Sequence, residues 1–215
     1  MPTAIFDLDG TITRHDTLIA YIAGFLSRRG PLSLLRIVRA LPAVLSFVFH
    51  QDRGRLKGAV IRATLGGVHR AELNAWTPAF VDQLLRSGLH DAAVQVIAAH
   101  RRSGDALTLL SASPDLYVPE IAARLGFEET ICTGVCWHGD RLEGSLTTAN
   151  RRGAEKARCV AQIRARDPRG VAVAYANAAS DIPHLRLVDR GVLVNARGAL
   201  RRLAQNAGIE CVEWH

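Results

Sequence analysis

AIFDLDGTITRHDT, residues 4–17, is the stretch that decides the fold expected for this chain. Residues 4–6 are typical of a buried strand, and two acids one residue apart, Asp7 and Asp9, follow it directly. Burying a carboxylate is unfavourable unless it is paired or bound to a metal. Gly10 also allows a plain surface turn, because Asp-Gly is a common turn dipeptide. Both interpretations stay open until the rest of the chain is considered.

Length and composition describe a globular protein with room for a sizeable core. The chain has 215 residues, of which 48% are hydrophobic and 22% are charged. This composition is far from that of disordered chains. The length suits one domain with an insertion or two small domains.

The net charge of +7 comes almost entirely from arginine. Of the 27 basic residues only Lys57 and Lys156 are lysines, which leaves 25 arginines. A basic chain is compatible with nucleic acid, a membrane surface or anionic small molecules as partners. The arginines are scattered in pairs, with no aromatic residues between them of the kind that stack on single strands. Nucleic-acid binding is therefore not expected.

Two further features bear on location. No signal peptide precedes the first strand, so we expect a cytoplasmic protein whose four cysteines are buried thiols.

The apolar run at residues 31–50 is interrupted by Arg36, Arg39 and Pro42, which argues against a membrane span. It is interpreted as an amphipathic, partly buried helix kinked near Pro42. Membrane-surface association remains a minor alternative.

The hydrophobic pattern divides the chain into a core and an insertion. Residues 17–85 follow helical spacing, with breaks that give about four helices. Beyond residue 90 helices and strands alternate, which predicts a parallel sheet with helices on both faces. The expected fold is therefore α/β and Rossmann-like, with an inserted α-helical bundle as a cap. The core is assigned to residues 1–14 and 87–215 and the cap to residues 15–86.

Reactive side chains follow the predicted strands at the ends where ligands gather in such folds. Ser111 ends one strand, Asn177 ends another, and Asp181 lies four residues further on. Lys156 is placed early in the helix before that second strand. Ser113 is expected to cap a helix at residues 114–126, with Pro114 in its first turn. Turn chemistry alone would not gather these groups at one edge.

The motifs together resemble the haloacid dehalogenase-like hydrolase superfamily. FDLDGT is similar to its first motif, LLSAS to its second, Lys156 to its third and YANAASDIP to its fourth. The order and spacing of all four carry the resemblance over the whole chain. The helical insertion looks like the cap of phosphoserine phosphatase-type members.

The resemblance implies hydrolysis of phosphomonoesters through an aspartyl-phosphate. Asp7 would attack phosphorus, which an ionised carboxylate can do without activation. Asp9 would protonate the leaving oxygen and then activate water. Ser111 and the backbone amide of Ala112 would hold phosphoryl oxygens. Lys156 would neutralise the accumulated negative charge.

The resemblance also implies Mg²⁺, whose preferred ligands are hard oxygens. Asp7, the backbone carbonyl of Asp9 and the fourth motif would hold it. The fourth motif usually opens with an acid, and this chain has Asn177 there. An amide brings no charge, so metal affinity should fall unless Asp181 becomes a direct ligand.

The substrate is expected to be a small, amine-bearing phosphomonoester such as phosphoserine or histidinol phosphate. Asp16 matches the acid that faces the substrate ammonium, although it equally suits the start of a helix. Thr11 is assigned, with Asp16 and Ala112, to the substrate-binding residues, although bonding within the loop and a plain turn are equally compatible roles. Lys57 and Arg62 could meet a substrate anion, but solvated-face roles are commoner. A homodimer is one option for the assembly, and a weakened family member that binds a phosphorylated ligand without turnover is the alternative function.

Overall fold

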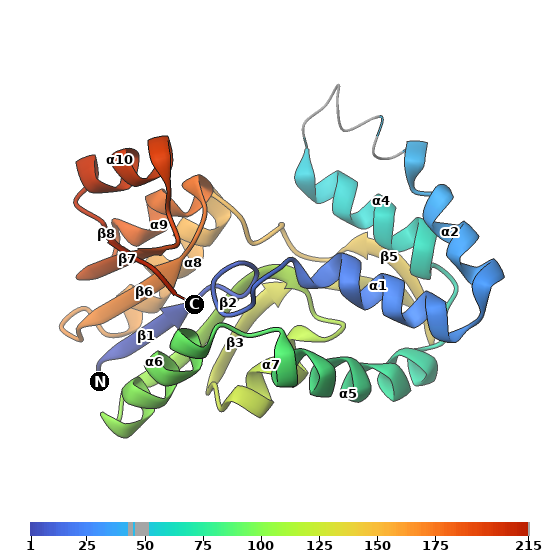
Figure 1. Cartoon of the computed structure of the whole chain (residues 1–215), viewed down its shortest axis with the longest axis horizontal. Coiled ribbons are helices and arrows are strands. Elements are labelled where there is room, and N and C mark those ends of the chain that lie inside the picture. The colour runs from blue at the N-terminus through green and yellow to red at the C-terminus, as the bar shows by residue number, and fades with distance from the viewer. Residues whose placement is uncertain (43–44, 46–51, 215) are drawn as a thin grey trace.

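The structure is a computed structural model that describes residues 1–42, 45 and 52–214 (Figure 1). Its elements are, in chain order, β1 (Thr3–Phe6), α1 (Thr17–Arg28), η1 (Pro31–Leu34), α2 (Leu35–Val38), α4 (Arg53–Leu65), α5 (Arg70–Ser87), α6 (Asp91–Arg102), β2 (Ala106–Pro114), α7 (Val118–Leu125), β3 (Glu129–Thr133), β4 (Val135–His138), β5 (Arg141–Leu146), α8 (Ala154–Arg166), β6 (Ala172–Ala176), η2 (Ala179–Asp181), α9 (Ile182–Leu185), β7 (Arg190–Val194), α10 (Gly198–Asn206) and β8 (Glu210–Val212).

Six parallel strands form the main sheet in the order β3-β2-β1-β6-β7-β8. The first strand is central, and it pairs with β2 on one side and β6 on the other. The chain fills one half of the sheet before it crosses to the other half. The order of the strands therefore reverses between β1 and β6, and ligands bind at such switch points in open α/β sheets.

Helices cover both faces of this sheet, as predicted, and each face has its own core. Ala4 and Phe6 of β1 belong to the cluster that includes residues of α6 and α7. Ile5, between them, belongs to the cluster on the opposite face, with Val160 of α8 and Leu185 of α9. This alternation follows from the two-residue period of a strand. The α/β Rossmann-like fold expected from the sequence is confirmed.

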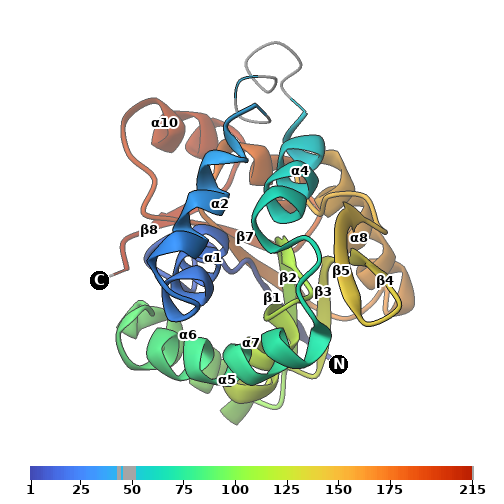
Figure 2. The ribbon, with the colours of Figure 1, turned by 90° about the vertical axis from the view of Figure 1, so that its right-hand side faces the viewer.

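A helical insert, residues 14–88, separates β1 from the α6–β2 unit and projects from the sheet (Figures 1 and 2). The two chain segments that join it to the core lie side by side. Thr13 forms an antiparallel bridge with Leu89, and the Arg14 amide donates to the Gly88 carbonyl at 2.8 Å. The insert thus leaves the core and returns to it at a single point. The domain boundaries assigned above remain a prediction.

The hairpin β4–β5 contacts the insert although it follows β3 in the chain. Gly144 in β5 has a φ of +96°, and a Cβ there would lie 2.7 Å from the backbone nitrogen of Arg62 in α4. Only glycine permits this close approach of strand to helix. Arg62 and Glu143 form an ion pair beside it.

Two local predictions are wrong. Strand β2 continues to Pro114, so Ser113 does not cap a helix, and α7 begins only at Val118. The Asp115 amide instead donates to the Thr133 carbonyl, which extends contact with β3 past the predicted helix start. Sheet pairing has therefore outweighed a local capping signal, as tertiary context commonly does.

The predicted helix at residues 31–50 also differs from the described part of that segment. A 3₁₀ turn, η1, is followed by the short helix α2, and a turn at residues 39–40 ends it. Neither η1 nor α2 contains a buried residue, and only Ser33 and Arg36 are half-buried, so the apolar side chains are exposed there, contrary to the prediction. The rest of the prediction, at residues 43–44 and 46–50, lies outside the described residues. Among the helices that the structure describes, none has the length and apolar character needed to cross a membrane.

Candidate active site

A cleft of about 460 Å³ lies between the sheet and the insert. Its core wall is made of residues that follow or precede the central strands: Asp7, Asp9, Lys156, Asn177 and Asp181. Its cap wall comes from α1 and α4 of the insert: Leu18, Ile19, Arg53, Leu56, Lys57 and Val60. The cleft thus opens at the carboxyl ends of β1 and β6, where the strand order reverses.

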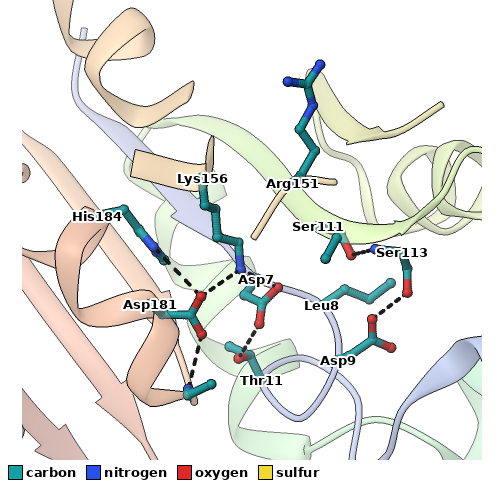
Figure 3. Close-up of polar contacts among 12 residues, drawn as sticks. Asp7, Leu8, Asp9, Thr11, Ser111, Ser113, Arg151, Lys156, Asp181 and His184 are labelled. Atoms are coloured by element: carbon teal, nitrogen blue, oxygen red, sulfur yellow. Dashed lines mark hydrogen bonds and ion pairs between the residues drawn. The ribbon is translucent and has the colours of Figure 1, made fainter. Parts of the chain in front are cut away.

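Asp7 is fixed at the bottom of the core wall. It directly follows β1, and its amide donates to the Tyr175 carbonyl of β6 at 2.9 Å. Its Oδ1 lies 2.7 Å from Lys156 Nζ, and its Oδ2 accepts a 3.4 Å bond from Thr11 Oγ1 (Figure 3). Thr11 is completely buried beneath the loop. It therefore bonds within the loop, which was one of its expected roles, and it does not line the cleft as a substrate-binding residue would.

Lys156 joins Asp7 to Asp181. Its Nζ lies 3.2 Å from Asp181 Oδ1, and the other oxygen of Asp181 accepts the Ala178 amide at 3.1 Å. Behind Asp181, His184 Nδ1 lies 3.8 Å from Oδ1 (Figure 3). Burial and the nearby Lys156 lower the pKa of His184 to about 3, so the imidazole is neutral at physiological pH. The structure brings together all three groups on which the sequence-based site depended.

Burial and ion pairing oppose each other at this cluster. Desolvation raises the pKa of Asp7 to about 6, although the Lys156 ammonium acts to lower it. Desolvation lowers the pKa of Lys156, but the carboxylates of Asp7 and Asp181 outweigh it and the net shift is upward. One ammonium thus faces two buried carboxylates. The cluster has unneutralised negative charge, which favours an additional cation.

Asp9 lies between the core and the insert, and one hydroxyl from each side bonds it. Its Oδ1 accepts from both the amide and the hydroxyl of Thr17, each at 2.7 Å, and its Oδ2 accepts from Ser113 Oγ at 2.6 Å. Desolvation raises the pKa of this carboxyl despite those bonds. Thr17 and Ser113 were missed because the sequence assigned them to a helix and to a helix cap. Since Thr17 begins α1, the contact ties a core acid to the insert.

The C-terminal part of β2 presents backbone atoms to the cleft. Ala112 lines the cleft, whereas Ser111 is completely buried and its Oγ accepts from the Ser113 amide at 3.0 Å. The Ala112 carbonyl accepts from Thr133 Oγ1 at 2.7 Å and also from Lys57 Nζ. A phosphoryl group beside this end of β2 would therefore meet Ala112 before it met the Ser111 hydroxyl.

Lys57 belongs to the site, contrary to the expected solvated-face role. Its Nζ bonds the Ala112 carbonyl and lies 2.7 Å from Asn150 Oδ1. Burial lowers its pKa to about 8. Within the part of the chain that the structure describes, no carboxylate lies within 4.0 Å of this ammonium. Its rarity was a usable signal, because lysine occurs only twice in 215 residues. Arg62, on the same helix, pairs with Glu143 at the surface.

Asp16 has the expected role at the start of a helix, and its place in the cleft is compatible with the other expected role. It is the N-cap of α1, where its Oδ1 accepts the Leu18 amide at 3.0 Å, and it also lines the cleft. A cap needs only one carboxylate oxygen, so the second stays available to a positively charged group.

The donor set fits a hard divalent cation. Gly10 has a φ of +75°, and a Cβ there would collide with the Asn177 amide, so Asn177 lies directly against the loop of Asp7 and Asp9. In the described residues no cluster of three or more His, Cys, Asp or Glu side chains could hold a metal. The metal ligands expected from the sequence differ from such a cluster, because they include the Asn177 amide and the backbone carbonyl of Asp9. Together with the excess carboxylate charge around Lys156, these oxygens suit Mg²⁺.

The comparisons with known proteins agree with this geometry. The model of the family described as "haloacid dehalogenase-like hydrolase" matches residues 4–186. Protein CicA of Caulobacter vibrioides is 32% identical over 185 residues, which cover 86% of this chain and 82% of CicA. This chain belongs to the haloacid dehalogenase-like hydrolase family.

Two other relatives extend the comparison over nearly the whole chain. Phosphoserine phosphatase SerB1 of Mycobacterium tuberculosis is 26% identical over 220 residues, covering 96% of this chain and 69% of SerB1. The crystal structure of a protein of unknown function from Bordetella pertussis Tohama I has a TM-score of 0.81 at 24% identity, covering 98% of this chain and 97% of that one. The resemblance stated from the motifs is confirmed, and the chain is an enzyme of this hydrolase family, of the phosphatase type.

Proposed function

We propose that the protein is a Mg²⁺-dependent hydrolase of small phosphomonoesters that works through an aspartyl-phosphate. The observation that carries this proposal is the buried Asp7 at the end of the central strand, with Lys156 Nζ 2.7 Å from its carboxylate. A carboxylate held by a cation at the bottom of a cleft is suited to attack phosphorus. The similarity to SerB1 supports the same chemistry.

In the first half-reaction a carboxylate oxygen of Asp7 forms a bond to phosphorus while the ester P–O bond breaks. Asp9 gives its proton to the leaving oxygen, and its raised pKa favours the protonated form that this step needs. In the second half-reaction Asp9 takes a proton from water, whose oxygen attacks phosphorus and releases Asp7 and inorganic phosphate. The Thr17 and Ser113 hydroxyls keep Asp9 aimed along the cleft.

Charge stabilisation comes from both sides of the phosphoryl position. Lys156 neutralises Asp7, while the amide of Ala112 binds phosphoryl oxygens, with Ser111 placed behind it. Mg²⁺ would be held by Asp7, the Asp9 carbonyl and Asn177, with Asp181 adjacent, and would supply positive charge at the phosphoryl group. Phosphoryl transfer depends mainly on such positioning and charge neutralisation.

The substrate we propose carries both an amine and a second anionic group. Asp16 offers a carboxylate oxygen to the amine, and the Lys57 ammonium, which has only neutral bonding partners, offers a cation to the anion. Phosphoserine has both groups, whereas histidinol phosphate has only the amine. These contacts therefore favour phosphoserine-type substrates.

The cytoplasmic location and the homodimer stay predictions.

The second candidate function is binding of a phosphorylated ligand without hydrolysis. Asn177 favours it, because the residue brings no charge to the metal position. Under this alternative Mg²⁺ would add nothing to catalysis.

Hydrolysis of p-nitrophenyl phosphate and of phosphoserine separates the two. We expect Mg²⁺-dependent turnover that EDTA removes and that Asp7→Asn lowers by roughly 10⁴-fold or more. Turnover in Mg²⁺ no higher than that of Asp7→Asn would establish the binding protein instead. Trapping of radiolabelled phosphate on the acid-quenched wild-type protein, absent from Asp7→Asn, would show the covalent step.

A further inference from the structure

Exposed apolar side chains are concentrated at one end of the insert. Thirteen large hydrophobic residues of the described chain are exposed, and seven of them fall within residues 32–45. The most exposed are Leu32 at 80%, Val38 at 63% and Leu35 at 62%. Isolated exposed apolar residues need no explanation, but a concentration of this kind marks an interaction surface. We call Leu32, Leu35, Ile37, Val38, Leu41 and Arg39 the η1–α2 surface.

The charge around this surface is mainly positive, although Arg29 pairs with Glu72 of α5 at 3.1 Å. From residue 17 to residue 51 the sequence has four arginines, Arg28, Arg29, Arg36 and Arg39, and no aspartate or glutamate. A partner surface that matched it would be negatively charged and apolar underneath. A second copy of the chain offers the wrong charge, because it would bring the same arginines to the contact.

Arg36 fixes how α2 lies on the insert. Its guanidinium donates to the carbonyls of Thr64 at 3.1 Å and Gly66 at 3.3 Å, at the end of α4. Leu35 and Val38 are one turn apart on α2 and remain exposed, so the tethered helix presents them outward. Figure 1 shows α2 beside α4, at the end of the molecule opposite β8.

We propose that the η1–α2 surface binds the surface of anionic phospholipid membranes. Leucine and valine side chains would enter the boundary between headgroups and acyl chains, and the arginines would contact anionic headgroups. One apolar or one basic signal alone gives marginal attachment, and the two together give a stable one. The α1 helix begins at the cleft, where Ile19 lines its mouth, and ends beside this surface. Docking would therefore occur through the insert and leave the sheet away from the membrane.

Sedimentation of the full chain with vesicles tests the proposal. Vesicles of phosphatidylcholine alone are compared with vesicles containing about one third phosphatidylglycerol, at about 0.1 M and 0.5 M NaCl. We expect co-sedimentation with the anionic vesicles at low salt, release at high salt, and none with neutral vesicles. Leu35→Ser with Val38→Ser should lower the partition coefficient about tenfold, and Arg39→Glu at least about fivefold.

The matched control is Arg202→Glu with Leu203→Ser on α10, where both side chains are exposed on the core domain. It removes the same kinds of side chain and should bind vesicles like the wild type. Unchanged vesicle binding by the Leu35/Val38 and Arg39 variants, or an equal loss in the control, would overturn the proposal. Light scattering could instead show a dimer that the Leu35→Ser and Val38→Ser substitutions dissociate, with no vesicle binding by any form of the protein. That result would also overturn the proposal. Hydrolysis of p-nitrophenyl phosphate by the same preparations reports separately on the proposed reaction.

Discussion

The two walls of the cleft each carry one of the two lysines of the chain, in opposite electrostatic states. On the core wall Lys156 is paired with Asp7 and Asp181, and those carboxylates raise its pKa. On the cap wall Lys57 bonds only to a carbonyl and an amide oxygen, and burial lowers its pKa to about 8. The first charge is neutralised by the protein itself. The second is influenced by Asp9 and Asp16 but forms no ion pair with any described carboxylate, so it can pair with an anion that enters the cleft.

This difference separates the two tasks of the site. The core wall is built from strand ends, whose positions the sheet dictates, and in the proposed reaction it holds the groups that react. The cap wall is built from helices of an insert, and in the same proposal it holds the groups that distinguish substrates. Substitutions on the core wall should therefore remove turnover, and substitutions on the cap wall should change preference.

Lys156→Met tests the core wall and should have the largest effect. It leaves two buried carboxylates unpaired, so the free energy of unfolding should fall by about 3–5 kcal/mol. Turnover of p-nitrophenyl phosphate should fall by roughly 10²–10³-fold. Chemical denaturation and steady-state kinetics measure both. Lys57→Met, which removes the other lysine, should cost at most about 1–2 kcal/mol, and equal losses in the two variants would erase the distinction between the walls.

Lys57→Met tests the cap wall. A charged group that loses its partner costs about 2 kcal/mol, so the KM for phosphoserine should rise roughly 30-fold with little change in kcat. The KM for p-nitrophenyl phosphate, which has no second anion, should change much less. Arg62→Met is the matched control, because it removes a cation from the same helix outside the cleft. A parallel rise in KM for both substrates would mean that Lys57 acts on the phosphoryl group.

The pH dependence of KM sharpens this assignment. With a pKa of about 8, Lys57 is mostly charged at pH 7 and mostly neutral at pH 9, so its attraction for an anion is lost as pH rises. The KM for phosphoserine should rise roughly tenfold over that interval. Titration of the substrate itself affects wild type and variant alike. The part of the rise in KM that comes from the enzyme should be absent in Lys57→Met. If the pH profile of KM were the same in Lys57→Met as in the wild type, the titrating group would be a different one.

Asn177→Asp should have the smallest effect and concerns the metal. A carboxylate in place of the amide adds charge to the ligand set, so the Mg²⁺ concentration for half-maximal activity should fall roughly three- to tenfold. Asn150→Asp adds the same charge to the cleft beside Lys57 and should leave Mg²⁺ dependence unchanged. An equal change in Mg²⁺ dependence for both substitutions would mean that Mg²⁺ responds to the overall electrostatic potential of the cleft and not to Asn177 as a ligand.

The core of this fold could be predicted from the sequence because its signals are local and repeated. Alternating helices and strands gave the parallel sheet, and the strand-end rule gathered Asp7, Ser111 and Asn177 at one edge. The convergence of Lys156 and Asp181 on Asp7 followed from the same rule and from the family resemblance.

The insert was harder to predict because its contacts are between elements far apart in the chain. Nothing near Lys57 in the sequence shows that its ammonium meets Ala112 and Asn150. Ser113 has the local signature of a helix cap, yet the pairing of β2 with β3 continues past it and turns its hydroxyl to Asp9. Apolar residues in α2 suggested burial, but Arg36 makes the contact with α4 and the apolar side chains of α2 stay exposed.

The bridge between Thr13 and Leu89 affects how this protein can evolve. Because both crossing segments meet at one short ladder, everything between them can be lengthened, shortened or replaced without altering the register of any sheet strand. Selection can then exchange most of the insert for another while inheriting Asp7, Lys156 and Asp181, provided that a residue in the place of Thr17 still bonds Asp9. A chimaera that joins residue 13 to residue 89 through a borrowed module is the form in which new specificities would arise on this scaffold.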